Sequence, residues 1–277
     1  MSTVIEVIRP SEGVSVLMMD NGPRNFSTAP MLERLDSVLL GERNGGARVV
    51  IIGSSVEGFF ISHGHIGDTV ANLTGRQEPS GDVRAFLRVQ KQLDTGPMIS
   101  IAAIDGQAWG GGAELAWSCD FRVASETSTL GQPEVIVGLP PAGGATRIVR
   151  IAGEGAAKRL VLDGRPVTAV EAYRLGLIDL LVPQGRTLDA AIEWATWLAG
   201  REPGALTMVK ELIVSGRDVP MSDALKRETA AFVSRFSDSS VVERALEVQA
   251  RYDGGADSYD AFQISRPEHI RHRLPGF

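Results

Sequence analysis

Three consecutive glycines, at positions 110–112, stand between a segment typical of a buried strand and a segment typical of a helix. Residues 98–104 are apolar and predict the strand, residues 105–106 predict its exit turn, and the helical pattern begins at residues 114–119. Glycine allows positive φ angles and lets a ligand approach the main chain. The chain is therefore predicted to contain an α/β strand-to-helix turn with an accessible main chain.

The first amides of this helix have no partner within the helix and carry the positive end of its dipole. Such a turn can bind an oxygen atom that becomes negatively charged. Glu114, in the segment Gly110-Gly111-Gly112-Ala113-Glu114, would project beside whatever these amides polarise. The alternative is an ordinary first-turn glutamate next to a flexible loop, and the glycines alone leave both interpretations open.

A second glutamate follows twenty residues later, in the apolar segment Gly131-Gln132-Pro133-Glu134. A carboxylate in such surroundings either pairs with a cation or has its pKa raised by desolvation, and a raised pKa suits a general acid or base. An ion pair of Glu134 with Arg147 is the simpler alternative. Together, the two glutamates indicate acid/base chemistry on a bound acyl group.

Composition narrows the classes of protein. A chain of 277 residues with 43% hydrophobic composition can bury a substantial core, and a net charge of -6 argues against a general nucleic-acid surface. The single cysteine, Cys119, excludes an internal disulfide framework and is predicted to lie in the core. The sequence shows neither an apolar run of membrane-spanning length nor a signal peptide, so the cytoplasm is the predicted compartment, without membrane attachment.

Several motifs along the chain carry a family resemblance; they are residues 22–25, 104–116, 119–120, 131–134, 138–147, 157–164 and 171–179. With these motifs the chain closely resembles the crotonase (enoyl-CoA hydratase/isomerase) superfamily, over roughly residues 4–250. The resemblance implies an α/β fold, a spiral of ββα units, followed by a C-terminal helical region that makes trimer contacts. It assigns residues 1–200 to the core with the acyl-CoA site and residues 201–277 to the helical region and an extended tail.

The resemblance also implies roles for site residues. The main-chain amides of Gly64 and Gly111 would form an oxyanion hole for the thioester oxygen. Glu134 would lie nearest the C2 proton, and Glu114 would activate water. The loop around Gly64 departs from the family pattern, because His63 occupies a position that is usually glycine and His65 one that is usually aspartate.

Six residues are predicted to bind substrate. Arg24 is the candidate for the phosphates of coenzyme A, and Phe86, on a helix predicted over about residues 82–93, is expected to wall the acyl pocket. The others are Ser62, His63, His65 and Leu139. No metal site is predicted, since only His269 and His272 in the tail accompany the two loop histidines. No cofactor is expected either, because the coenzyme A thioester is the substrate.

Because both family glutamates are present, the resemblance favours an enoyl-CoA hydratase, a lyase. The alternatives are another reaction on a CoA thioester, either double-bond isomerisation or C–C cleavage, and a noncatalytic oligomeric binding protein. The expected assembly is a homotrimer or a dimer of trimers. The tail after Asp253 exceeds the usual family length and is predicted to pack against a neighbouring subunit; its notable residues are Tyr259, Phe262, Arg266, Arg271 and Arg273.

Periodicity predicts the remaining elements. Residues 67–82 are expected to be a loop or weak helix that is mobile without ligand. Capping boxes are predicted at Thr168-x-x-Glu171 and Ser240-x-x-Glu243. The predicted strands are residues 13–19, 48–53 and 121–125, and the predicted helices are one from about Ser27 and those at residues 187–200, 204–215, 220–236 and 240–252.

Overall fold

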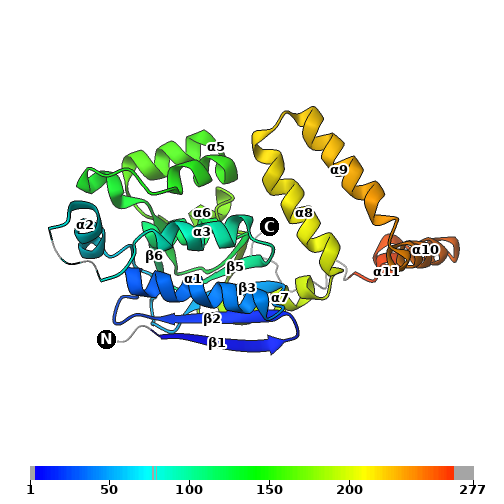
Figure 1. Cartoon of the computed structure of the whole chain (residues 1–277), viewed down its shortest axis with the longest axis horizontal. Helices are drawn as coiled ribbons and strands as arrows, with labels where there is room; N and C mark the ends of the chain where they lie inside the picture. Colours follow the sequence, from blue (N-terminus) through cyan, green and yellow to red (C-terminus); the bar gives the residue numbers. More distant parts are fainter. Residues whose placement is uncertain (1–3, 77, 79, 265–277) are drawn as a thin grey trace. The chain divides into compact units, whose positions relative to one another are not determined.

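The computed structural model describes residues 4–76, 78 and 80–264 (Figure 1). The chain divides into two compact units, Met1–Thr207 and Met208–Phe277. In the described residues, the first unit holds both β-sheets and the second is entirely helical.

The larger sheet of the first unit has six strands in the order β1-β2-β3-β5-β7-β10. Only β1 and β2 are antiparallel, and every other neighbouring pair is parallel. Parallel strands covered on both faces need apolar residues throughout, which explains the unbroken apolar runs in the sequence. The strands are β1 (Val4–Ser11), β2 (Val14–Asp20), β3 (Val49–Ser54), β5 (Ile99–Ile104), β7 (Phe121–Ser125) and β10 (Leu180–Val182).

A second sheet of four short strands, in the order β4-β6-β8-β9, carries the connections that lead to the predicted site. The first three strands are parallel and β9 is antiparallel to β8. The strands are β4 (Phe59–Ile61), β6 (Gln107–Trp109), β8 (Thr129–Gly131) and β9 (Val167–Thr168). Because β4 and β6 pair, the chain segments that follow them leave the sheet as neighbours.

Helix α7 (Thr187–Ala199) covers one face of the larger sheet. Its small residues Ala191 and Ala195 are fully buried and pack in one cluster with alternate strand residues such as Ile51 and Ile101. Alanine lets the helix approach the strands closely, while the strand alternation sends the intervening residues to the opposite face.

Helices α1 (Ala29–Asn44) and α3 (Ala85–Thr95) lie side by side in the same unit (Figure 1). The Thr28 side chain caps α1 by accepting from the Met31 amide. The other helices of this unit are α2 (Ile66–Thr74), α4 (Gly111–Ser118), α5 (Gly144–Asp163) and α6 (Ala169–Arg174), with a 3-10 helix, η1, over Pro133–Val137.

Most of the predicted elements are confirmed, with some boundaries corrected. The predicted helix start at Glu114 is wrong, because Gly110 turns the chain with φ 49° and α4 begins at Gly111. The capping box at Ser240 is also wrong: Asp238 caps α10 by accepting from the Ser240 amide at 3.0 Å. At Thr168 only the cap itself is confirmed: the Thr168 side chain accepts from the Glu171 amide at 3.2 Å, whereas the Glu171 carboxylate forms an ion pair with Arg159.

The second unit contains the end of α8 (Pro203–Ser215), then η2 (Gly216–Asp218), α9 (Met221–Arg235), α10 (Ser239–Asp253) and α11 (Ser258–Phe262). The ring of Phe262 meets that of Tyr252 at 6.1 Å, so the described part of the tail packs on α10. Tyr259 lies in α11. Arg266, Arg271 and Arg273, like His269 and His272, lie outside the described residues.

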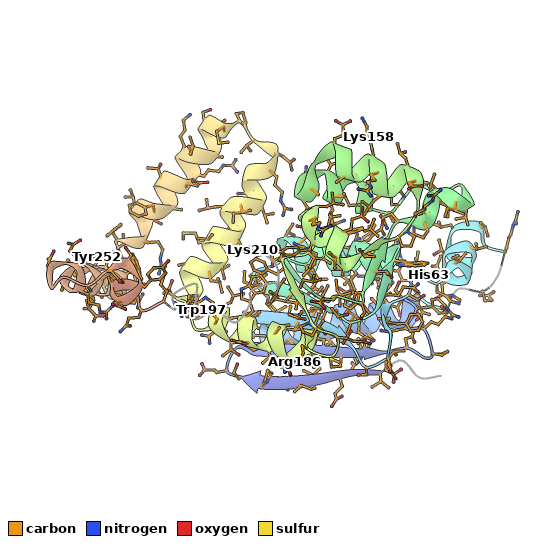
Figure 2. The ribbon with its side chains drawn as sticks, turned by 180° about the vertical axis from the view of Figure 1, so that it is seen from behind. His63, Lys158, Arg186, Trp197, Lys210 and Tyr252 are labelled. Atoms are coloured by element: carbon orange, nitrogen blue, oxygen red, sulfur yellow. The ribbon has the colours of Figure 1, made fainter. Side chains whose placement is uncertain are left out.

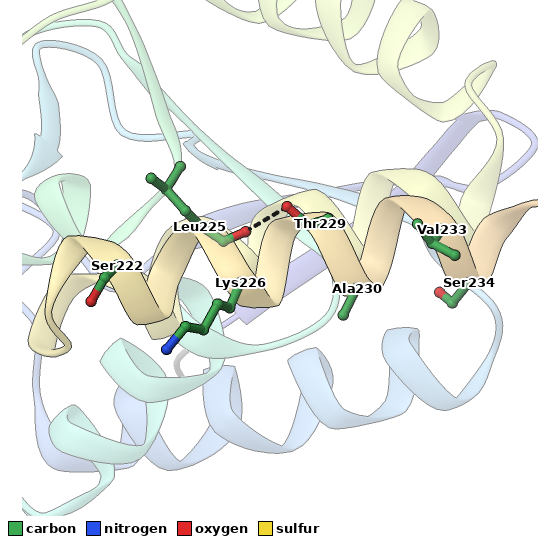
Figure 3. Close-up of a pocket in the computed structure, with 7 residues that line it drawn as sticks. All are labelled: Ser222, Leu225, Lys226, Thr229, Ala230, Val233 and Ser234. Carbon is green, nitrogen blue, oxygen red and sulfur yellow. Dashed lines mark hydrogen bonds between the residues drawn. The ribbon is translucent and has the colours of Figure 1, made fainter.

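A shallow hollow runs along α9 (Figure 3). Its lining contains no carboxylate, imidazole or thiol. The lining residues are Ser222, Leu225, Lys226, Thr229, Ala230, Val233 and Ser234.

Two leucines of α1 provide a test of the packing. Leu35 is fully buried, whereas Leu40 on the same helix is 43% exposed. We expect Leu35→Ala to lower the free energy of unfolding by about 2–5 kcal/mol through lost contacts and a residual cavity. Leu40→Ala should cost well under half as much, and the urea-denaturation midpoints of the two variants measure the difference. Equal midpoints would contradict the described placement of α1.

Candidate active site

Glu114 is buried in the first turn of α4, with only 2% of its surface exposed. The Gly144 amide, at the start of α5, donates to its Oε1 at 3.0 Å. Burial raises the pKa of Glu114 to about 7, and the nearby charge of Glu134 also raises it, against the lowering effect of the Gly144 bond. A carboxyl group with this pKa can either take up or release a proton near neutral pH.

Glu134 lies in η1, close to the turn that precedes α4. A methyl group at Gly110 would stand only 2.6 Å from Glu134 Oε1, so a side chain there would push the carboxyl group away, and Gly110 also has a φ of 49° that favours glycine. Burial raises the pKa of Glu134, while its own backbone hydrogen bond and the charge of His63 lower it. Its Oε2 is buried and has no hydrogen-bond partner among the described residues.

The ion pair proposed as the simpler role of Glu134 is absent from the described residues. The Arg147 guanidinium instead lies 3.7 Å from Asp94 Oδ2. Its charge lowers the pKa of Glu114, though less than burial raises it. Glu134 is therefore a half-buried carboxyl group without a neutralising ion pair to Arg147, which is an arrangement that suits proton transfer.

Gln132 is a site residue that the sequence analysis missed. Its side-chain amide Nε2 donates to the Gly110 carbonyl at 3.2 Å and reaches Glu134 Oε1 at 3.5 Å. A methyl group at Gly144 would overlap Gln132 Oε1 and lie 3.2 Å from Glu114 Cγ. The buried Gln132 thus fills the space between the segments that carry the two glutamates. Its place in the Gly131-Gln132-Pro133-Glu134 segment was visible in the sequence, but a structural role there leaves no distinct pattern.

The two glycines predicted to donate to a substrate oxygen lie next to each other. Gly64 follows β4 and Gly111 begins α4, and a methyl group at Gly111 would lie 3.2 Å from the Gly64 nitrogen. Gly64 forms an isolated parallel bridge with Ser27. The Ser27 amide donates to the His63 carbonyl, and the His65 amide donates to the Ser27 carbonyl. Throughout the described segments, neither the Gly64 nor the Gly111 amide donates a hydrogen bond. Two adjacent unsatisfied amides can bind one oxygen atom.

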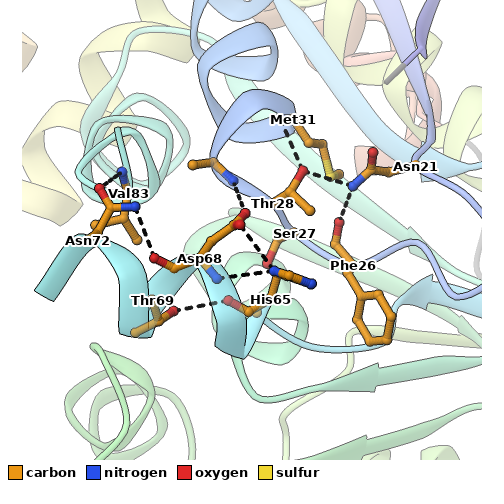
Figure 4. Close-up of polar contacts among 12 residues, drawn as sticks. Asn21, Phe26, Ser27, Thr28, Met31, His65, Asp68, Thr69, Asn72 and Val83 are labelled. Atoms are coloured by element: carbon orange, nitrogen blue, oxygen red, sulfur yellow. Dashed lines mark hydrogen bonds and ion pairs between the residues drawn. The ribbon is translucent and has the colours of Figure 1, made fainter. Parts of the chain in front are cut away.

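His65 caps α2 (Figure 4). Its Nδ1 accepts from the Asp68 amide at 3.1 Å, and Asp68 Oδ2 in turn accepts from the Ala29 amide at the start of α1. Aspartate is a good helix cap for the same reason, namely a side-chain acceptor within reach of the first turn. The histidine therefore has a structural explanation at a position where the family resemblance implies aspartate.

His63 lies in the loop between β4 and α2 (Figure 2). Its ring packs against that of Phe26, with the centroids 4.7 Å apart, and its Nδ1 contacts the Gly64 carbonyl oxygen at 2.6 Å. A methyl group at Gly110 would lie 3.6 Å from His63 Cβ. His63 and Glu134 therefore flank the same point of the main chain.

The other predicted substrate-binding residues have varied surroundings. Ser62 is buried and its hydroxyl accepts from Gln107 Nε2 at 3.1 Å, whereas Arg24 is exposed, with its guanidinium 5.8 Å from the Phe59 ring centre. Phe86 is half-buried in α3, and Leu139 is 52% exposed after η1. Within the described residues, no hydrogen bond or ion pair joins Arg24 or Ser62 to either glutamate.

The described residues lack both a metal-binding cluster and a membrane-spanning helix. They contain no group of three or more His, Cys, Asp or Glu side chains that could hold a metal ion. None of their helices combines the length and the apolar character needed to cross a membrane.

The family model described as enoyl-CoA hydratase/isomerase matches residues 9–249. The chain belongs to this family, the crotonase superfamily. It is 33% identical over 238 residues to the short-chain-enoyl-CoA hydratase of Clostridium acetobutylicum, which covers 83% of this chain and 89% of that protein. It is 38% identical over 203 residues to the enoyl-CoA isomerase/hydratase fer4 of Mycosarcoma maydis, which covers 71% of this chain and 69% of the relative.

Solved structures agree with the family assignment. The enoyl-CoA hydratase of Bacillus anthracis superposes with a TM-score of 0.78 at 29% identity, covering 91% of this chain and 96% of the other. DspI of Pseudomonas aeruginosa superposes with a TM-score of 0.79 at 26% identity. The match covers 89% of this chain and 94% of DspI. The predicted crotonase-type α/β fold is confirmed, and crotonase-type enzymatic activity is supported.

The pKa of Glu114 predicts how stability depends on pH. A carboxyl group whose pKa rises from 4.5 to about 7 on folding binds more protons in the native state, so stability falls as pH rises through this window. Well above pH 7, ionisation of the buried Glu114 lowers the free energy of unfolding by roughly 3 kcal/mol. Glu114→Gln removes the charge and keeps an acceptor for Gly144, so it should stabilise the protein at pH 8 and much less at pH 5.

Urea denaturation at pH 5 and pH 8 measures this difference. Glu154→Gln is the matched control, because that glutamate side chain is 71% exposed and pairs only on the surface of α5. If Glu114→Gln changed stability equally at both pH values, the buried ionisation of Glu114 would be refuted.

Proposed function

We propose that this protein is an enoyl-CoA hydratase, which reversibly adds water to the C2–C3 double bond of a 2-enoyl-CoA thioester. One observation carries the proposal: the buried Glu114 and the half-buried Glu134, both with raised pKa values, lie near two adjacent unsatisfied amides. Several relatives at about 30% identity are named as enoyl-CoA hydratases, which supports the same chemistry.

The amides of Gly64 and Gly111 would donate to the thioester oxygen. Withdrawal of electrons from the conjugated system makes C3 susceptible to attack, and the same two donors stabilise the negative charge that develops on the oxygen. Because the site is already organised around the charged state, each donor is worth on the order of 10²–10³ in rate.

The two glutamates would divide the proton transfers. The water oxygen bonds to C3 while its proton passes to Glu114, and Glu134 supplies the proton that bonds to C2. This step starts with Glu114 ionised and Glu134 protonated, and the reverse reaction uses the same groups in the opposite sense. Burial raises the pKa of both carboxyl groups, which makes the protonated form of each more accessible.

Substrate would be held outside the reacting atoms by weaker contacts. Arg24 is an exposed cation near Phe59 and is our candidate for the coenzyme A phosphates. Lys158 projects from α5 (Figure 2) but forms an ion pair with Glu154 at 2.6 Å, which makes it the less suitable partner. Phe86 would wall the acyl chain. The reaction as proposed needs no group beyond the thioester, water and these side chains.

Double-bond isomerisation is the second candidate. The observation in its favour is the name of the Mycosarcoma maydis relative, an isomerase/hydratase that is 38% identical to this chain. A single glutamate can remove and return a proton for isomerisation, whereas hydration uses two. The retention of both glutamates, each with a pKa raised by burial, favours hydration.

We expect Glu134→Gln to reduce turnover of crotonyl-CoA by at least 10²-fold while leaving thioester binding within about threefold. The amide has nearly the same volume as the carboxyl group but cannot transfer the proton. Loss of the conjugated-thioester absorbance measures turnover, and calorimetric titration measures binding. Turnover should also fall strongly in Glu114→Gln, whereas turnover of the control variant Glu154→Gln should match that of the wild type.

Unchanged turnover in Glu134→Gln would overturn its assigned role. Product analysis separates the candidate reactions, because hydration gives a 3-hydroxyacyl-CoA and isomerisation gives only a shifted double bond. Binding without any change of the crotonyl or a longer enoyl group would favour isomerisation of another unsaturated thioester.

We further propose that the helical region assembles the protein into a homotrimer or a dimer of trimers. Several large apolar side chains are exposed on α8, α9 and α10, and burying them against other subunits would stabilise an oligomer. They are Val209, Ile213, Met221, Leu225, Phe232, Val233 and Leu246.

Light scattering after size exclusion is expected to give three or six times the mass of one chain, 29.6 kDa. The double variant Leu225→Asp/Phe232→Asp should lower this mass, because charges would be buried without partners. Glu228→Ala on the same helix is the control and should leave the mass unchanged. A monomeric wild type would refute the assembly.

A further inference from the structure

The imidazole of His63 is the part of the loop after β4 that the proposed reaction leaves without a role. Among the described residues, positive φ angles outside glycine occur only at Asn25 and Gln263, so His63 occupies its position without that kind of backbone strain. Its ring is half-buried against Phe26, with centroids 4.7 Å apart. This packing fixes the direction of the imidazole, whose Nδ1 contacts the Gly64 carbonyl oxygen.

The Gly64 amide belongs to the same peptide unit as the His63 carbonyl. The Ser27 amide donates to that carbonyl at 3.1 Å, and the Ser27 hydroxyl lies within 3.5 Å of it. In a trans peptide the C=O and N–H bonds point in opposite directions. The two contacts from Ser27 therefore set the direction of the Gly64 N–H.

The next peptide unit contains the Gly64 carbonyl and the His65 amide. The His65 amide donates to the Ser27 carbonyl at 3.0 Å. On its other side, His63 Nδ1 lies 2.6 Å from the Gly64 carbonyl oxygen. A carbonyl oxygen can only accept, so Nδ1 carries the hydrogen and the imidazole is the donor. Both peptide units that meet at Gly64 are thus held by hydrogen bonds.

Glycine is the residue whose backbone rotates most freely, so an amide donor on Gly64 needs support from its neighbours. The main-chain bonds of Ser27 would be present with any residue at that position. The imidazole of His63 and the hydroxyl of Ser27 are the side-chain contributions, and the Ser27 hydroxyl also lies 3.5 Å from where a methyl group on Gly111 would stand.

We propose that His63, assisted by the Ser27 hydroxyl, is a positioning residue that aims the Gly64 amide at the substrate oxygen. The inference rests on the proposed function, because it requires a thioester oxygen between the Gly64 and Gly111 amides. His63 acts through Gly64 and does not itself exchange a proton with the substrate. Its removal should lower the rate more than the affinity, since an aimed donor matters most for the charge of the transition state.

Three substitutions of His63 separate this role from simple packing. Asparagine places an N–H donor close to the position of Nδ1, glutamine places one further out, and alanine has none. We expect kcat to fall by about 10–100-fold in His63→Ala and His63→Gln with KM changed less than about threefold. His63→Asn should recover to within about threefold of wild-type kcat.

A spectroscopic reading of the bound carbonyl makes the test independent of turnover. The probe is 4-dimethylaminocinnamoyl-CoA, whose absorbance moves to longer wavelength when hydrogen bonds polarise its thioester carbonyl. The shift seen with wild-type protein should be at least halved in His63→Ala and restored in His63→Asn. Ser27→Ala should reduce the absorbance shift by a smaller amount. Ser37→Ala is the control and should leave the shift unchanged, because it removes only an exposed serine hydrogen bond to a main-chain carbonyl on α1.

The results distinguish this inference from the proposed function. A normal wild-type shift that persists in His63→Ala would overturn the positioning role alone. An asparagine variant no better than glutamine would also overturn it, and this comparison holds even if the alanine variant fails to fold. A wild-type protein that binds no CoA thioester would overturn the proposed function and this inference with it.

Discussion

The contact between Glu134 and the main chain at Gly110 is the interaction on which the arrangement of the site depends. Gly110 has φ 49° and no side chain, so η1 can place the Glu134 carboxyl group directly against the turn before α4. A methyl group there would stand 2.6 Å from Glu134 Oε1 and push the carboxyl group away. The same turn starts the helix that carries Glu114 and presents the Gly111 amide. One glycine therefore brings the Gly111 amide and both glutamates close together.

Burial changes the pKa values of the two glutamates. Desolvation raises the pKa of both glutamates, and the mutual repulsion of their charges adds to the effect on Glu114. The Gly144 amide opposes it by donating to the ionised form. Gln132 is buried beside Gly144 and donates to the Gly110 carbonyl and to Glu134 Oε1. The energy needed to hold carboxyl groups away from water is supplied by the surrounding core.

The loop after β4 shows how different side chains can meet the same structural needs. His65 caps α2 with a ring nitrogen, and Asp68 links that cap to the start of α1. His63 supports the Gly64 peptide from one side while Ser27 supports it from the other. A loop that departs from the family pattern in two histidines thus keeps an amide in position through hydrogen bonds made by its own side chains. The structural role of His65 explains its identity without any contact to substrate.

The local elements and the identity of the chemical groups could be predicted from the amino-acid sequence. Apolar runs at β3 and β5, the glycine turn before α4 and the threonine cap at Thr168 depend on neighbouring residues, so their patterns predict them. The glutamates could be recognised as candidates for the same reason. The contact of Gly110 with Glu134 and the hydrogen bond from Gln132 to Gly110 join segments about twenty residues apart, so they appear only in the folded chain. The tertiary structure also decided the cap of α10, where Asp238 rather than Ser240 reaches the first turn. Contacts between distant segments, and the desolvation that sets the pKa values, arise only when the strands pair and the helices pack over them.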